Sequence, residues 1–210
     1  MEDVLDVYTR PYDERFPVVC VDEKSKELHS TPRGEIAVRP GHAKRVDADY
    51  ERHGTANLFM SVEPLTGHCR VRVTTRRTAA DFACELQQLV DVDYPQAERI
   101  VLVTDNLNTH TPACLYDRYD PAEARRIARK LEWHYTPEHG SWLNMAELEL
   151  SVISRQCLQR RIPDQEALCR ETKAWETRHN QTARSIRWHF TAEDARTKLR
   201  RLYPAINRQD

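Results

Sequence analysis

The sequence predicts an α/β fold, a mixed sheet flanked by helices with a C-terminal helical extension. Two short apolar, β-branched runs, at residues 16–21 and 99–104, each end at an acidic residue and indicate buried strands. Residues 57–74 have the pattern of a hairpin, and the second half of the chain has helical spacing. At 210 residues the chain is long enough to form one such domain with a buried hydrophobic core.

The first half of the chain contains the predicted hairpin. The run FPVVCV at 16–21 predicts a buried strand that stops at Asp22. Residues 29–54 are rich in Pro, Gly and charge, so we expect an irregular, exposed insertion. Residues 57–62 and 68–74 predict a strand pair joined by the turn EPLTG at 63–67.

The second half alternates helices and strands. Thr78 is the expected N-cap of a helix at 78–90, and Asp120-Pro121 opens another. RIVLVT at 99–104 is the most apolar β-branched run and predicts a central strand that ends at Asp105. The remaining predicted elements are a strand at 131–135 and helices at 121–131, 142–160, 164–179 and 192–202. The expected division is a lead-in at 1–15, a main domain at 16–161 with its insertion at about 29–55, and a helical extension at 162–210.

Composition predicts a soluble, cytosolic protein. Hydrophobic residues make up 40% and charged residues 31% of the chain. No apolar run approaches the ~20 residues of a membrane helix, and the N-terminus lacks the order of a signal peptide. The six cysteines are scattered without a CxxC pair, which argues against a zinc site or a disulfide framework.

The net charge of −1 does not by itself suggest a nucleic-acid partner. DNA-binding domains usually carry a basic excess, because phosphate neutralisation supplies most of their affinity. The basic residues here are local and cluster at 70–77, 125–130, 155–161 and 196–201. Each cluster is explained equally well as the charged, solvent-exposed face of a helix as it is by contact with nucleic acid.

Two acids at strand ends are the strongest chemical signal. In open α/β sheets the ligand site commonly lies beyond the carboxyl ends of the strands, where Asp22 and Asp105 are expected to meet. Two carboxylates repel each other unless a divalent cation lies between them, and Mg²⁺ suits oxygen ligands. A third carboxylate is expected from the helix at 142–160. Its apolar stripe leaves Glu147 and Glu149 on opposite flanks, so periodicity does not choose between them.

Three segments resemble the transposases of the IS630 insertion-sequence group, relatives of the Tc1/mariner transposases. These segments are VVCVDEKS at 18–25, LVTDNLNTHT at 102–111 and YTPEHGSWLNMAELELSVISRQC at 135–157. They occur in the order of that group, and the resemblance runs from about residue 18 to 203. It implies a ribonuclease-H-like fold and a DDE-type catalytic domain.

The resemblance implies roles for individual residues. Asp22 matches the first acid and Asp105 the second, and the Asn-x-x-Glu element that begins at Asn144 places the third at Glu147. The 41 residues between Asp105 and Glu147 are more than is usual in the wider superfamily. The implied cofactors are two Mg²⁺ or Mn²⁺ ions held by these acids. The implied activity is DNA strand cleavage and strand transfer by in-line phosphoryl transfer.

The same resemblance implies DNA as the partner, both transposon ends and target, with a homodimer as the working form. It implies that the protein does not bind a membrane, and that it is located in a bacterial cytoplasm and associates with the nucleoid when bound to DNA. Asn106, Asn108 and His110 also fit local backbone bonding, and Trp142 fits a core anchor. The candidate substrate contacts are Lys24, Arg76, Arg77, Asn106, Asn108, His110, Trp142 and Asn144.

Two alternatives follow from the residues. Full-length transposases of this group carry N-terminal helix-turn-helix domains, and the residues before Phe16 are too few for one. An excised domain or a truncated gene is therefore expected, and a truncated product that only binds DNA or dimerises is the alternative function. A Mg²⁺ phosphatase would need an acid two residues after Asp22, where Lys24 stands.

Overall fold

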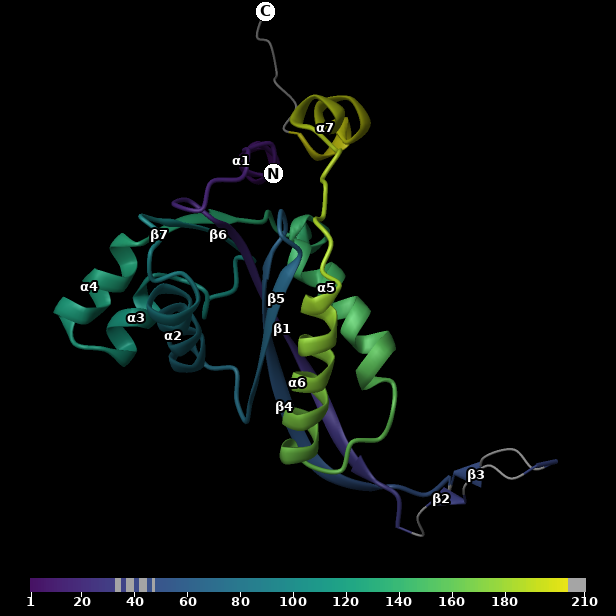
Figure 1. Cartoon of the computed structure of the whole chain (residues 1–210). Helices are drawn as coiled ribbons and strands as arrows, with labels where there is room; N and C mark the ends of the chain where they lie inside the picture. Colours follow the sequence, from purple (N-terminus) through teal and green to yellow (C-terminus); the bar gives the residue numbers. More distant parts are fainter. Residues whose placement is uncertain (33–34, 37–39, 42–44, 47, 204–210) are drawn as a thin grey trace, which may run out of the picture.

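A five-stranded mixed sheet forms the centre of the molecule in the computed structural model, which describes residues 1–32, 35–36, 40–41, 45–46 and 48–203 (Figure 1). The strand order is β5-β4-β1-β6-β7. The β1–β4 and β4–β5 pairs are antiparallel, whereas β1–β6 and β6–β7 are parallel. The strands are β1 (Val18–Ser30), β4 (Glu51–Glu63), β5 (His68–Thr74), β6 (Ile100–Thr104) and β7 (Leu131–Tyr135). The predicted α/β sheet of mixed direction is confirmed.

Helices cover both faces of the sheet, as Figure 1 shows. Alternate residues of β1 point to opposite faces. Cys20 therefore joins the core beneath α5 and α6, and Val21 joins the core beneath α2, α3 and α4. The helices are α1 (Glu2–Tyr8), α2 (Ala79–Gln88), α3 (Ala113–Arg118), α4 (Pro121–Arg129), α5 (Met145–Ile153), α6 (Gln165–Gln181) and α7 (Ala192–Lys198).

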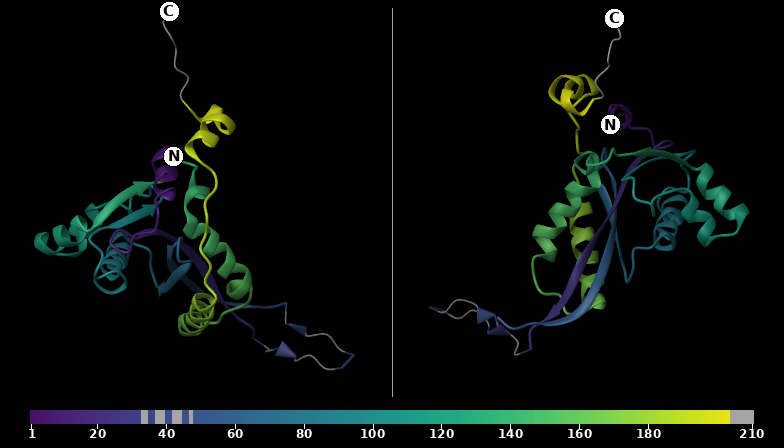
Figure 2. Two further views of the ribbon diagram at one scale, coloured as in Figure 1. Left: turned by 45° about the horizontal axis from the view of Figure 1, so that its top comes forward. Right: turned by 180° about the vertical axis from the view of Figure 1, so that it is seen from behind.

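Strand β1 is longer than predicted. It does not stop at Asp22 but continues to Ser30, because β4 pairs with it in antiparallel register from Cys20–Val62 to Ser30–Glu51, with a bulge between Glu27 and His29. Figure 2 shows from two further sides that the outer part of this strand pair projects beyond the helices. The two short strands β2 (Glu35–Ile36) and β3 (Arg45–Val46) pair with each other there. The rest of the expected irregular insertion lies in part outside the described residues.

The long helix expected at 142–160 is divided into three pieces. A 3₁₀ turn spans Ser141–Leu143, α5 begins at Met145, and a π-helical segment continues over Ser154–Leu158. The helix begins later than predicted because Asn144 has an extended backbone and acts as the N-cap. The predicted caps Thr78 and Asp120 are both confirmed.

Two helices were not predicted, and both bury apolar side chains. Helix α1 buries Val4, Leu5 and Val7, and α3 buries Cys114 and Leu115. Each is at most seven residues long and too short for a clear helical pattern.

The two C-terminal helices pack against different parts of the fold. Helix α6 packs along β5, and α7 packs against α1, where Arg196 pairs with Glu2 at 2.6 Å. The connection between α6 and α7 is held to the hairpin turn, because Ile186 N donates to Pro64 O at 2.7 Å. In the parts of the chain that the structure describes, no helix is both long and apolar enough to cross a membrane.

Candidate active site

Asp22 is buried in the middle of β1, with 6% of its surface exposed. Its Oδ1 accepts a hydrogen bond from Glu23 N at 2.7 Å and its Oδ2 accepts one from Asn144 Nδ2 at 3.1 Å. Burial raises the pKa of Asp22 to about 7. The hydrogen bond from Glu23 N opposes this rise, and the negative charges of Glu147 and Asp105 add to it. Asp22 therefore lies within electrostatic reach of both Glu147 and Asp105.

Asn144 joins the strand to the helix. Its Nδ2 donates to Val21 O at 2.9 Å as well as to Asp22, while its Oδ1 accepts from Ala146 N at 3.1 Å. The side chain is fully buried. One amide thus caps α5 and fixes the orientation of the Asp22 carboxylate. Asn144, predicted as a substrate contact, lies behind the carboxylate and away from solvent.

Asp105 lies directly after β6, as predicted, and contacts a buried histidine. His110 Nδ1 hydrogen-bonds to Asp105 Oδ1, and His110 Nε2 lies 3.0 Å from Glu23 Oε2. Burial lowers the pKa of His110, but the hydrogen bonds and charges of the two acids outweigh this effect and raise the pKa to about 9. His110 is 1% exposed, so its polar contacts are with these acids and with Thr104 Oγ1 at 3.3 Å.

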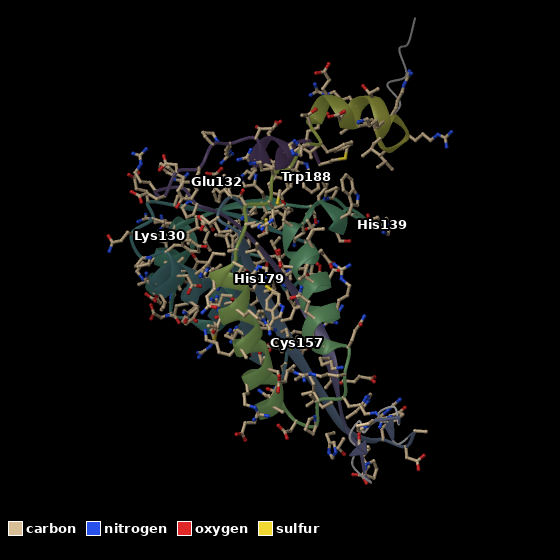
Figure 3. The ribbon with its side chains drawn as sticks, turned by 45° about the vertical axis from the view of Figure 1, so that its right-hand side comes forward. Lys130, Glu132, His139, Cys157, His179 and Trp188 are labelled. Carbon is tan, nitrogen blue, oxygen red and sulfur yellow. The ribbon has the colours of Figure 1, made fainter. Side chains whose placement is uncertain are left out.

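The two glutamates of α5 point to different surroundings. Glu147 is exposed, and its side chain makes no hydrogen bond or ion pair with another residue that the structure describes. Glu149 is buried and lies 3.5 Å from His179 on α6. Figure 3 shows His179 on α6, which lies beside α5. Of the two glutamates, Glu147 is the one whose charge acts on Asp22.

The remaining candidate contacts are all exposed: Lys24, Arg76, Arg77, Asn106, Asn108 and Trp142. The register of β1, β4 and β5 places Ser25, Asn57 and Thr74 in one line across the sheet. Lys24 and the residues just after β5 therefore lie at the same level, and Arg77 reaches back to Glu23 Oε1 at 3.5 Å.

Trp142 is 43% exposed and packs on the C-terminal connection. Its ring lies 6.3 Å from that of Trp188 and 6.0 Å from that of Phe190. One face of the indole is therefore held by aromatic neighbours, while the rest remains open to solvent.

A pocket of about 330 Å³ opens beside Asp105. It is formed by Asp105, Asn106 and Leu107 after β6 and by the loop at 136–141 after β7. His139 in this loop has φ 59°, which is uncommon for a residue with a Cβ. Figure 3 shows His139 near the end of the molecule where α5 begins.

Glu23 was not among the predicted site residues, although it follows Asp22 directly. Its side chain is 4% exposed and lies on the opposite face of β1 from Asp22, between His110 and Arg77. Strand alternation places Glu23 on that face, but the sequence gives no sign that a histidine 87 positions later lies against it.

The donor set fits a hard divalent cation. Carboxylate oxygens are the ligands that Mg²⁺ and Mn²⁺ prefer, and a cation would offset the burial and the mutual repulsion that together raise the pKa of Asp22. Among the described residues, no three such side chains are close enough together to hold an ion in their present positions. Glu147 is exposed and makes no ion pair with a described residue, so its side chain is free to turn toward Asp22.

Comparison with known proteins places the chain in a family. The model of the DDE superfamily endonucleases matches residues 17–169, which is more than half of the chain. No curated protein matches the chain.

Two solved structures have a similar fold. They are the Mos1 strand transfer complex and the Mos1 transposase paired-end complex with the left transposon end. Each has a TM-score of 0.52 and 17% identity over 83% of this chain, which spans 50% and 51% of the two Mos1 chains. The five-stranded sheet flanked by helices is thus similar to the ribonuclease-H-like catalytic domain of the Mos1 transposase. Because the family model covers residues 17–169, the chain belongs to the DDE superfamily endonucleases.

Proposed function

We propose that this chain is a transposase catalytic domain of the IS630 group that cleaves DNA and joins it to a target. The observation that carries the proposal is the buried carboxylate of Asp22 on β1, which lies near the negative charges of Asp105 after β6 and of Glu147 in the first turn of α5. Family membership and the three sequence motifs support it. Asp22, Asp105 and Glu147 are the proposed metal ligands.

Two Mg²⁺ or Mn²⁺ ions held by these carboxylates would activate the attacking hydroxyl and stabilise the leaving oxygen at phosphorus. The protein's own contribution is orientation. Asn144 fixes Asp22, and the contact between Asp105 and His110 fixes the second acid. Glu147, on a helix whose N-cap is buried, can approach from the solvent side.

The proposed partner is DNA, both transposon ends and target, bound by a homodimer in a bacterial cytoplasm at the nucleoid. Lys24, Arg76 and Arg77 supply positive charge at the level of the candidate ligands, which suits phosphate contacts. Asn106 and Asn108 offer amide donors, and the exposed face of Trp142 suits base stacking.

A non-catalytic remnant that binds DNA or dimerises is the second candidate. The net charge of −1 favours it, because little general attraction to phosphate is available.

Metal titration followed by a cleavage assay distinguishes these functions. The purified chain is titrated with Mn²⁺ and Mg²⁺ by calorimetry, with and without a DNA duplex, and then assayed for cleavage. We expect saturable binding that raises the melting temperature and is lost in Asp22→Ala and Asp105→Ala. Binding without cleavage, or no binding even with DNA, would favour the remnant.

A further inference from the structure

A buried histidine connects the two strands that deliver the first two acids. His110 contacts Asp105 Oδ1 through Nδ1 and faces Glu23 Oε2 at 3.0 Å through Nε2. Glu23 follows Asp22 on β1, and Asp105 follows β6. The imidazole therefore bridges the neighbouring strands at the level of the proposed metal ligands.

The backbone pairing between these strands stops before that level. Parallel pairing of β1 with β6 is present at Val18–Val101, Val19–Leu102 and Cys20–Val103 and extends no further among the described residues. Two residues beyond Cys20 and Val103, the strands carry Asp22 and Asp105. The like charges of Asp22 and Asp105 repel each other, and no backbone pairing between β1 and β6 opposes a separation at this level. The contacts of His110 with Asp105 and Glu23 therefore lie at the level where β1 and β6 are no longer paired through their backbones.

The ring is held rigidly and out of reach of solvent. Its centroid lies 4.1 Å from that of Phe82, Thr104 Oγ1 lies 3.3 Å from Nδ1, and the residue is 1% exposed. His110 therefore has no open face for DNA. Its contact occupies Oδ1 of Asp105, and Oδ2 has no hydrogen-bond partner among the residues that the structure describes.

We propose that His110 is a positioning residue that clamps Asp105 to Glu23 and so fixes the Asp105 carboxylate relative to Asp22. This inference rests on the proposed function, in which both aspartates hold the metal. His110 does not touch DNA or metal in this proposal. Groups that orient a metal's ligands typically change its affinity 10- to 100-fold when they are removed, so the clamp predicts a measurable effect.

Two amide substitutions separate the two contacts of the ring. In His110→Asn the side-chain nitrogen replaces Nδ1 and keeps the contact with Asp105. In His110→Gln the nitrogen replaces Nε2 and keeps only the contact with Glu23. His110→Ala removes both, and Phe82→Leu disturbs the same packing without removing either contact.

The measurements are the Mn²⁺ dissociation constant by calorimetry, with and without a DNA duplex, and the melting temperature in chelator. We expect His110→Ala and His110→Gln to weaken Mn²⁺ binding by about 10- to 100-fold. We expect His110→Asn to stay within about threefold of the parent, because it keeps the contact with Asp105. Phe82→Leu should lower the melting temperature without changing Mn²⁺ affinity.

Equal Mn²⁺ affinity in the parent and all three His110 variants would overturn the inference alone. So would equal losses in all three that follow the fall in melting temperature, since this would show a role in packing only. A parent that binds no Mn²⁺, even with DNA, would overturn the proposed function and this inference together.

Discussion

Asn144 holds Asp22 and caps α5 with a single side chain. The amide nitrogen lies 3.1 Å from Asp22 Oδ2, and the amide oxygen lies 3.1 Å from Ala146 N in the first turn of the helix. Because Asn144 is fully buried, water cannot replace these bonds. The orientation of the first acid and the start of the helix that carries the third therefore depend on the same residue.

Asn144→Ala should lower the free energy of unfolding by roughly 2–4 kcal/mol, which combines a lost helix cap with unsatisfied buried groups. The control is Asp164→Ala, which removes the N-cap bond of α6 to Ala167 N and should cost only about 1 kcal/mol. Urea denaturation of both variants gives the comparison. Equal losses would show that the bonds of Asn144 to β1 add nothing.

The metal-free protein should lose stability as pH rises from about 4 to 7. The pKa of Asp22 rises from 3.8 to about 7 on folding, so the folded state binds this proton more tightly than the unfolded state. The resulting penalty is absent below pH 4 and complete above pH 7, where it is on the order of 2–4 kcal/mol.

Asp22→Asn removes this titration and should flatten the dependence of the melting temperature on pH between 4.5 and 8, measured in chelator. The slope is the readout, because the new amide also faces two donors and shifts the absolute stability. Parallel slopes in the parent and the variant would contradict the assignment to Asp22.

Glu147→Gln should abolish metal-dependent cleavage and leave stability within about 0.5 kcal/mol of the parent, because this side chain is exposed and makes no ion pair with a described residue. We expect a loss of about two orders of magnitude in the cleavage rate. Glu149→Gln is the matched control, two positions away on the same helix and facing His179. A larger loss of cleavage with Glu149→Gln would overturn the assignment of the third acid.

Gly67→Ala should detach the connection between α6 and α7 from the hairpin turn. The residue has φ 73°, and an added Cβ would lie 2.2 Å from Arg184 O. The added Cβ would meet backbone atoms of Arg184, and no flexible side chain can move aside. The free energy of unfolding should therefore fall by roughly 2–4 kcal/mol.

Gly54→Ala is the control for Gly67→Ala, since Gly54 has φ 86° with nothing within 4 Å of the added Cβ. It should cost about 1 kcal/mol from backbone conformation alone. Hydrogen exchange across residues 183–190 is the second readout. Protection that stays unchanged in Gly67→Ala would mean that the connection tolerates the substitution.

The sequence predicted the inner strands and their acids because burial dominates there. RIVLVT is apolar throughout and leads directly to Asp105. It did not predict the outer half of β1, because Glu23–Ser30 is polar and its strand conformation depends on pairing with β4. Helical periodicity left Glu147 and Glu149 open, and only the packing of α6 separates them.

The contacts between distant segments were beyond prediction. The bonds of Asn144 to Asp22 and of His110 to Asp105, and the close approach of His110 to Glu23, depend on side-chain geometry that appears only when distant segments meet. Lone buried polar residues of this kind carry no periodic signal. The sequence identified both residues as candidates but not what they contact.

The bond between Asn144 and Asp22 also sets the order in which the site can form during synthesis. The two residues are 122 positions apart, so a ribosome that has released β1, β4, β5 and β6 has still not released the helix that orients the first acid. A contact of such separation requires a long loop to close, and this entropic cost slows its formation. A nascent chain therefore has no complete set of these three carboxylates until α5 has emerged and docked.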